Sequence, residues 1–135
     1  MSKRRGRSRR KRDVSYDYRI EVLNRNGFSS YREYLKSDLW SDIKRRVLER
    51  DGGACRVCGQ EAKYVHHDSY GDVTIRGEHI GKLYSLCLRC HGEVEFEGKR
   101  KRDFSSARKA LAHKIEFGPH RWTRDIALAY TAAGK

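Results

Sequence analysis

The sequence predicts an α+β fold, in which short strands and helices surround a four-cysteine zinc site. Cys55 and Cys58, and later Cys87 and Cys90, each place two thiolates three residues apart on a tight turn. Two such knuckles supply the four ligands of a tetrahedral zinc ion, and a complete shell leaves no open position, so we expect a structural Zn²⁺. Apolar residues at helical spacing predict helices before and after the knuckles, and a short apolar run beside a His-His pair predicts a strand.

The composition is that of one small basic domain with tails. The chain has 135 residues and a formal net charge of +13, which favours a polyanionic partner such as nucleic acid. It contains no apolar run of 18 residues and no signal-peptide pattern, so we expect a cytoplasmic protein without a membrane partner. In that reducing compartment, paired cysteines indicate metal binding instead of disulfides. Hydrophobic residues make up 37%, so the core is small and zinc should contribute directly to folding.

The first part of the chain is predicted to be a basic tail followed by helices. Residues 1–15 are rich in Lys and Arg and should form a disordered tail that contacts phosphates. Residues 16–36 form a helical or extended arm, in which a capping-box pattern beginning at Ser30 opens a short helix. A longer amphipathic helix follows from Ser37 and ends at an Asp-Gly-Gly sequence before the first knuckle. The tail residues expected to bind nucleic acid are Arg4, Arg5, Arg9 and Arg10.

The central segment, residues 37–98, is predicted to be the functional core. Residues 62–70 have the composition of a strand that carries the His-His pair, and glycines mark the loop that follows. Residues 83–86 lead as a second extended segment into the second knuckle. A helix is predicted from His91 through Phe96.

The C-terminal segment, residues 99–135, is predicted to be a basic linker followed by helices. Apolar residues in register predict an amphipathic helix over residues 104–117, and a weaker helix should cover residues 121–132. The linker lies directly after the core helix, where basic side chains can bind phosphates on either side of a reacting bond. Its basic residues are Lys99, Arg100, Lys101 and Arg102.

The histidines of the core indicate a second metal site beside the zinc. Adjacent residues of a strand face opposite sides, so His66 and His67 can do different jobs. On a helix, His91 and Glu95 lie one turn apart on one face. His66, His91 and Glu95 can therefore supply two nitrogens and an oxygen to Mg²⁺, Mn²⁺ or another divalent ion, with positions left for water and a phosphate oxygen. His67 would then deprotonate the water, since its ordinary pKa suits that step near neutral pH.

A plainer interpretation of the same histidines remains open. His91 would be a surface residue, and His66 or His67 would only pack beside the zinc knuckle. A His-His pair and a Cys-His pair within one zinc-bounded segment favour the metal site over this interpretation.

Together with the helix that runs from Trp40 into the first knuckle, these motifs resemble an HNH endonuclease of the ββα-metal (His-Me finger) type. The resemblance extends from Leu39 to Glu95 and covers about 57 of the 135 residues. It implies a core of two strands and a helix that begins near His91. It also implies metal-assisted hydrolysis of a DNA phosphodiester, which leaves a 5′-phosphate and a 3′-hydroxyl.

The resemblance also implies roles for individual residues. His67 matches the general base, His66 and His91 match metal ligands, and Glu95 matches a position that a third ligand often holds. The family's central Asn should fall about 15 residues after His67, where this chain has Lys82, and no Asn occurs between His67 and His91. We expect Lys82 to stabilise the charge that develops on the phosphorane.

The sequence thus leaves two functions open. The first is a metal-dependent DNA endonuclease with a structural zinc and a catalytic divalent ion, acting as a homodimer or within a larger nucleoprotein complex. The second is a non-catalytic zinc module, derived from the same scaffold without its Asn, that binds DNA, RNA or a ribonucleoprotein through its basic surface.

Overall fold

The structure, a computed structural model, describes residues 14–117, and in this part the chain is mixed helix and short antiparallel strand, so the α+β prediction is confirmed. Within residues 14–117, no helix is long and apolar enough to cross a membrane. The predicted helix over residues 121–132 lies outside the described residues, as does all of the predicted tail except its last two residues, which belong to the first helix. In chain order the elements are α1 (Val14–Arg25), α2 (Tyr31–Leu35), α3 (Asp38–Arg50), β1 (Tyr64–His67), α4 (Asp72–Ile75), β2 (Leu83–Leu86), α5 (Leu88–Glu95), β3 (Phe96–Glu97), β4 (Arg100–Lys101) and α6 (Phe104–Phe117).

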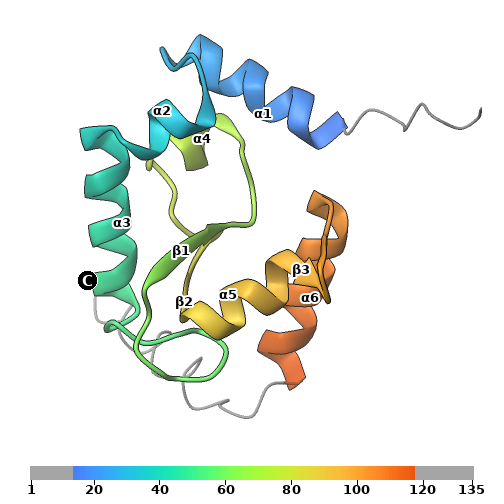
Figure 1. The fold of residues 1–135 in the computed structure, drawn as a ribbon. Helices are drawn as coiled ribbons and strands as arrows, with labels where there is room; N and C mark the ends of the chain where they lie inside the picture. The colour runs from blue at the N-terminus through green and yellow to red at the C-terminus, as the bar shows by residue number, and fades with distance from the viewer. Residues whose placement is uncertain (1–13, 118–135) are drawn as a thin grey trace, which may run out of the picture.

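The centre of the fold is the antiparallel pair β1 and β2, which the helices cover from two sides (Figure 1). In its register His66 lies opposite Tyr84 and His67 lies opposite Leu83. Helix α3 contacts the pair on one side, α5 contacts it on the other, and α6 packs against α5. The two histidines of β1 therefore project toward different layers, as the alternation of a strand requires.

Helix α3 is fixed at both ends by local sequence. The Ser37 hydroxyl accepts the Trp40 backbone N–H at 3.1 Å and caps the first turn. After the last turn, Gly52 and Gly53 take positive φ angles of 64° and 74°, which suit glycine and lead the chain into the first knuckle. The face that α3 turns to the core carries Trp40, Ile43 and Val47, all buried.

A buried carboxylate joins α3 to the sheet and to the first knuckle. Asp51 has no exposed side-chain surface, and its oxygens lie 2.8 Å from Arg50 Nη2 and 3.4 Å from Arg56 Nη1. The same carboxylate accepts the Ser85 backbone N–H of β2 at 3.3 Å. These contacts fix the end of α3 against the strand that carries the second knuckle.

The predicted strand over residues 62–70 is shorter in the structure, where β1 covers Tyr64–His67, and the predicted loop after it contains α4. This single turn of helix is held by contacts to α1. The carboxylate of Asp72 lies 2.7 Å from Arg25 Nη2 and accepts the Asn26 side-chain N–H at 2.9 Å. Such contacts between distant segments leave no periodic signal in the local sequence.

The glycine after α4 permits a close approach to α3, and its substitution is expected to be costly. Gly77 has a φ of 75°, and an added Cβ would lie 2.5 Å from Ile43 Cγ1 and 2.6 Å from Arg46 Nη2. We expect Gly77→Ala to lower the free energy of unfolding by about 2–3 kcal/mol in a denaturant titration. Gly81→Ala is the matched control, because its Cβ meets no atom within 4 Å, and it should change stability by less than about 0.5 kcal/mol. Equal stabilities of the two variants would contradict this packing.

Candidate functional site

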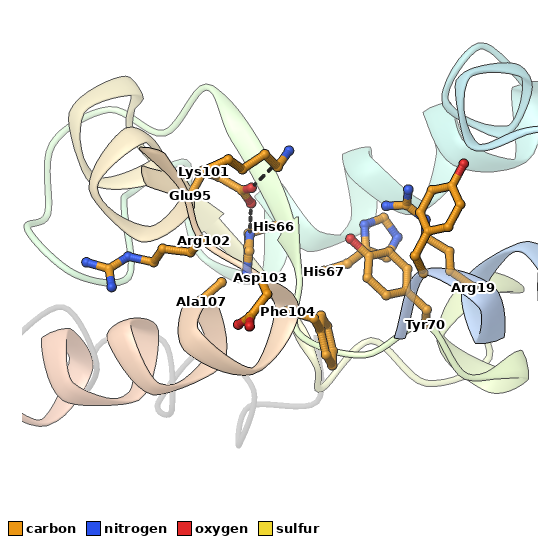
Figure 2. A pocket seen from close by; sticks show the side chains of 11 residues that line it. Arg19, His66, His67, Tyr70, Glu95, Lys101, Arg102, Asp103, Phe104 and Ala107 are labelled. Carbon is orange, nitrogen blue, oxygen red and sulfur yellow. Dashed lines mark ion pairs between the residues drawn. The ribbon is translucent and has the colours of Figure 1, made fainter. Parts of the chain in front are cut away.

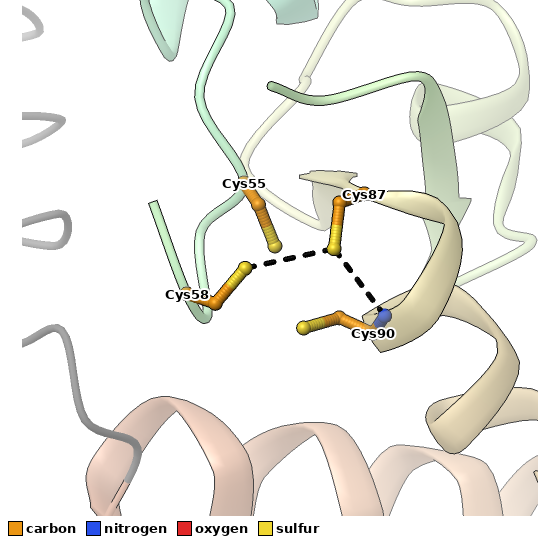
Figure 3. A group of neighbouring side chains, drawn as sticks. All are labelled: Cys55, Cys58, Cys87 and Cys90. Atoms are coloured by element: carbon orange, nitrogen blue, oxygen red, sulfur yellow. Dashed lines mark hydrogen bonds between the residues drawn. The ribbon is translucent and has the colours of Figure 1, made fainter. Parts of the chain in front are cut away.

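The four cysteines converge on one point between the end of α3 and the start of α5 (Figure 3). All four are buried, and their sulfur atoms lie within 4.8 Å of one another. Cys58 Sγ and Cys87 Sγ are 3.5 Å apart. Cys87 is the N-cap of α5, so the strand-to-helix junction holds its sulfur in place, and the Cys90 backbone N–H donates to that sulfur at 3.4 Å. The prediction that the two knuckles form one site able to hold a metal such as zinc is confirmed.

The surroundings of the cysteines suit thiolates that are held by a cation. Burial raises the pKa values of Cys58 and Cys90, so as free thiols these groups would resist ionisation. Burial opposes ionisation of Cys87 as well, but hydrogen bonds from Cys90 and the neighbouring thiols outweigh it and lower the pKa of Cys87. Backbone N–H groups also point at sulfur, as from Val57 to Cys55 Sγ at 3.4 Å. Four buried soft donors with such support fit Zn²⁺.

The three predicted ligands of the second metal lie together on the other side of α5. One ligand atom each from His66, His91 and Glu95 lies within 4.8 Å of the others. Glu95 Oε2 is 3.0 Å from His66 Nδ1 and 3.8 Å from His91 Nε2, and Figure 2 shows the first of these ion pairs. The ring of Tyr64 stacks on His91 at 4.8 Å and holds its orientation. His66, His91 and Glu95 are therefore grouped in the structure as the sequence analysis expected.

The protonation states of this group suit a cation. The hydrogen bond to His66 lowers the pKa of Glu95, so the carboxylate is charged at neutral pH. Burial lowers the pKa of His91 despite the nearby charge of Glu95, so its imidazole is neutral and offers a lone pair. His66 is buried, and its Nε2 has no hydrogen-bond partner. Two imidazoles and one carboxylate form a donor set that fits a divalent ion with free positions for other ligands.

His67 lies in an aromatic cage formed by three elements. Its ring stacks on Trp40 of α3 at 4.8 Å and on Tyr70 of the following loop at 5.1 Å. Its Nδ1 forms a hydrogen bond with the Tyr31 hydroxyl of α2 at 3.2 Å, and its Nε2 has no partner. The side chain is 2% exposed, and burial, aided by the neighbouring His66 and then by the charge of Arg19, lowers its pKa to about 3. His67 is therefore a neutral, rigidly held imidazole.

Both histidines of β1 border one cavity of about 160 Å³ (Figure 2). This volume is several times the roughly 30 Å³ of one liquid water molecule, so the cavity has room for solvent and an anionic group. Helix α1, the β3–β4 hairpin and α6 complete its walls. The charged and aromatic residues that line it are Tyr16, Arg19, His66, His67, Tyr70, Glu95, Lys101, Arg102, Asp103 and Phe104.

Lys82 does not line this cavity. It lies one position before β2, opposite Asp68, whose backbone N–H donates to the Lys82 carbonyl at 2.8 Å. Lys82 borders a neighbouring cavity of about 310 Å³ instead. The two cavities share Tyr70 and Phe104 in their walls, so they are adjoining parts of one surface. Lys82 therefore lies apart from the His66–Glu95 group, beside which the basic side chain of Lys101 lies.

The basic cluster after the core helix forms the β3–β4 hairpin, with Gly98 at a φ of 63° in its turn. Lys99 and Arg100 are exposed, whereas Lys101 and Arg102 line the His cavity. Lys101 Nζ lies 3.7 Å from Glu95 Oε1, which places positive charge beside the proposed ligand group. The tail residues Arg4, Arg5, Arg9 and Arg10 lie outside the described residues.

Sequence reasoning did not single out Arg19 or the aromatic cage. Arg19 is one of 31 Lys and Arg residues, and no motif distinguishes it. Tyr31 and Trp40 belong to the predicted helices, and no motif connects either residue with His67. Their contact with His67 depends on how α2 and α3 pack against β1, which a strand pattern does not specify.

No protein-family model, no curated protein and no solved structure matches the chain.

Proposed function

We propose that the chain is a metal-dependent endonuclease of the HNH type, which hydrolyses phosphodiester bonds in DNA on a ββα-metal core. The observation that carries the proposal is the grouping of His66, His91 and Glu95, whose ligand atoms lie within 4.8 Å of one another beside a separate four-cysteine group. The chain order of β1, β2 and α5 is the order of strands and helix in such a core. A four-cysteine zinc site is complete with its own ligands, so it does not account for the three further ligand residues beside it.

Each group of the cavity then has a role in hydrolysis. A divalent ion held by His66, His91 and Glu95 would stabilise negative charge on a phosphate oxygen. His67 takes the proton of the attacking water, and the tautomer that can do so at Nε2 donates its Nδ1–H to the Tyr31 hydroxyl oxygen. Burial keeps His67 in the neutral form that accepts a proton, but its pKa of about 3 makes it a weak base, so the proposed step requires contacts that stabilise the imidazolium as it forms, such as the Tyr31 hydroxyl at Nδ1.

The basic side chains of the cavity bind the polyanion. Lys101 and Arg102 lie at the edge of the cavity, where they would hold phosphates next to the reacting bond. Zinc at the four cysteines takes no part in the chemistry and stabilises the junction of the first knuckle with α5.

A second candidate function is a non-catalytic module that binds DNA, RNA or a ribonucleoprotein. The observation that favours it is the enclosure of His67, which is 2% exposed and has aromatic rings stacked on it. A histidine in such a cage can serve packing alone, as a polar member of a core. Lys82, at the position of the family's Asn, lies in the neighbouring cavity and takes no part in the His group.

Cleavage of supercoiled plasmid DNA by the purified chain tests the proposal. We expect nicked product with Mg²⁺ or Mn²⁺, none without added divalent ion, and a loss of about 10²-fold or more in rate for Glu95→Gln. The matched control is His79→Ala, which removes an exposed histidine that does not line the cavity and should cleave at the wild-type rate.

The same assay separates the two candidate functions. Absence of cleavage by zinc-loaded, folded protein would contradict the endonuclease. The binding module would then be supported if salt-dependent nucleic-acid binding survives in a folded His66→Ala, His67→Ala double variant.

A further inference from the structure

Arg19 of α1 holds its guanidinium in the wall of the His cavity, among three aromatic rings. Its Cζ lies 4.3 Å from the ring centroid of Tyr31, 5.1 Å from that of Tyr70 and 5.2 Å from that of Tyr16. Figure 2 shows Arg19 beside Tyr70 and His67. Contacts of this kind attract and orient the cation but leave its positive charge intact. The guanidinium is therefore fixed in position before any ligand arrives.

The charge of Arg19 has no carboxylate to neutralise it among residues 14–117, and its buried Nε has no hydrogen-bond partner there. Several arginines of the scaffold are paired instead. Arg25 lies 2.7 Å from Asp72, and Arg50 lies 2.8 Å from Asp51. These pairs join helices and loops to one another, whereas the guanidinium of Arg19 lies in a cavity wall among aromatic side chains and hydrogen-bonds Tyr70.

The acidic groups that line the cavity are themselves engaged. Glu95 forms ion pairs with His66 and Lys101. Asp103 Oδ1 accepts the Ser106 backbone N–H at 2.8 Å and caps the first turn of α6. The wall carries three basic side chains, Arg19, Lys101 and Arg102, against these two carboxylates, so its net charge is positive and favours an anionic ligand.

Resting on the proposed function, we propose that Arg19 is a phosphate-binding residue, whose guanidinium binds non-bridging oxygens of the phosphodiester presented to the His66–Glu95 group. A planar guanidinium can donate two parallel N–H bonds to one phosphate, and its face can remain stacked on Tyr31 while its edge binds. This assigns to Arg19, outside the segment that carries the zinc and histidine motifs, the stabilisation of phosphorane charge that the sequence predicted for Lys82.

Binding of a fluorescent DNA duplex at several NaCl concentrations, without added divalent ion, tests Arg19 apart from catalysis. We expect Arg19→Ala to weaken binding about 10- to 100-fold, as loss of a charge-assisted contact requires. The slope of log affinity against log salt should fall by about 1. Arg19→Lys keeps the charge but not the planar fork, so it should keep the slope and bind less tightly than the wild type.

Arg32→Ala is the matched control, because Arg32 is an exposed arginine of α2 that does not line the cavity. Its affinity and salt slope should stay within about 2-fold of the wild type. Zinc content and thermal unfolding of each variant establish that it is folded. If Arg19→Ala fails to fold, Arg19→Lys decides, and wild-type affinity together with a wild-type cleavage rate in that variant would overturn the inference.

Single-turnover cleavage by the same proteins with Mg²⁺ distinguishes this inference from the proposed function. A wild-type protein that does not cleave, with binding and salt slope lost in Arg19→Ala, would contradict the endonuclease and support Arg19 as a phosphate site. A wild-type protein that cleaves, with unchanged binding, slope and rate in folded Arg19→Ala, would overturn the inference and leave the endonuclease standing.

Discussion

Cys87→Ser is expected to release zinc and unfold the chain. Cys87 directly follows β2 and is the N-cap residue of α5. Its Sγ lies 3.5 Å from Cys58 Sγ, so this sulfur connects the two knuckles. Its replacement leaves an incomplete zinc shell around buried thiols. Structural zinc binds small domains with apparent free energies of about 10–16 kcal/mol, which is comparable to the whole stability of a typical domain at about 5–15 kcal/mol. A core of this size cannot compensate for such a loss.

Zinc content by mass spectrometry and far-ultraviolet circular dichroism measure this prediction. The wild type should hold one zinc per chain and should lose its helical spectrum when a strong chelator removes it. Leu88→Ser is the matched control, because Leu88 neighbours Cys87 but is 66% exposed, and it should keep both zinc and fold. A Cys87→Ser protein with a native spectrum and no zinc would contradict a structural metal at this site.

Replacement of His67 is expected to have the largest effect on cleavage. General-base catalysis contributes about 10²- to 10⁴-fold, so His67→Ala should lower the single-turnover rate by that factor. The same substitution also empties the cage between Trp40 and Tyr70, which costs stability. His67→Phe is therefore the sharper variant, since its ring fills the cage but has no nitrogen to take a proton.

The comparison of the two variants separates chemistry from packing. We expect both to lose cleavage equally, while His67→Phe keeps a thermal unfolding midpoint closer to that of the wild type. Cleavage by His67→Phe within a few-fold of the wild-type rate would remove His67 from the proton transfer and leave it a packing residue. Retained zinc in both variants shows that the structural site is intact.

Much of the scaffold could be predicted because its signals are local. The knuckles depend on thiolate spacing alone, and the four sulfurs meet as that spacing requires. Helix α6 begins at the predicted residue 104 and runs to residue 117, the last that the structure describes, because its apolar positions repeat at helical spacing. His91 and Glu95 share a helical face for the same reason.

The remaining features depend on contacts between distant segments. Helix α4 forms where Asp72 binds Arg25 of α1. The sequence of residues 71–78 contains no pattern that predicts this contact with α1. The cage of His67 needs α2 and α3 at defined positions beside β1. The family resemblance placed Lys82 at the position of the family's Asn, but in the structure Lys82 borders the neighbouring cavity. Arg19 lines the His cavity from α1, a helix that no motif marked.

The central claim is that one short segment carries two metal sites, a closed one that maintains the fold and an open one that serves hydrolysis. Equilibrium binding of Mn²⁺ to the zinc-loaded protein, with the zinc content measured on the same samples, tests it most directly. We expect one Mn²⁺ per wild-type chain, and for His66→Ala and Glu95→Gln binding weakened at least about 10-fold with one zinc retained. Mn²⁺ binding that is unchanged in these variants, or absent from the folded wild type, would contradict the account.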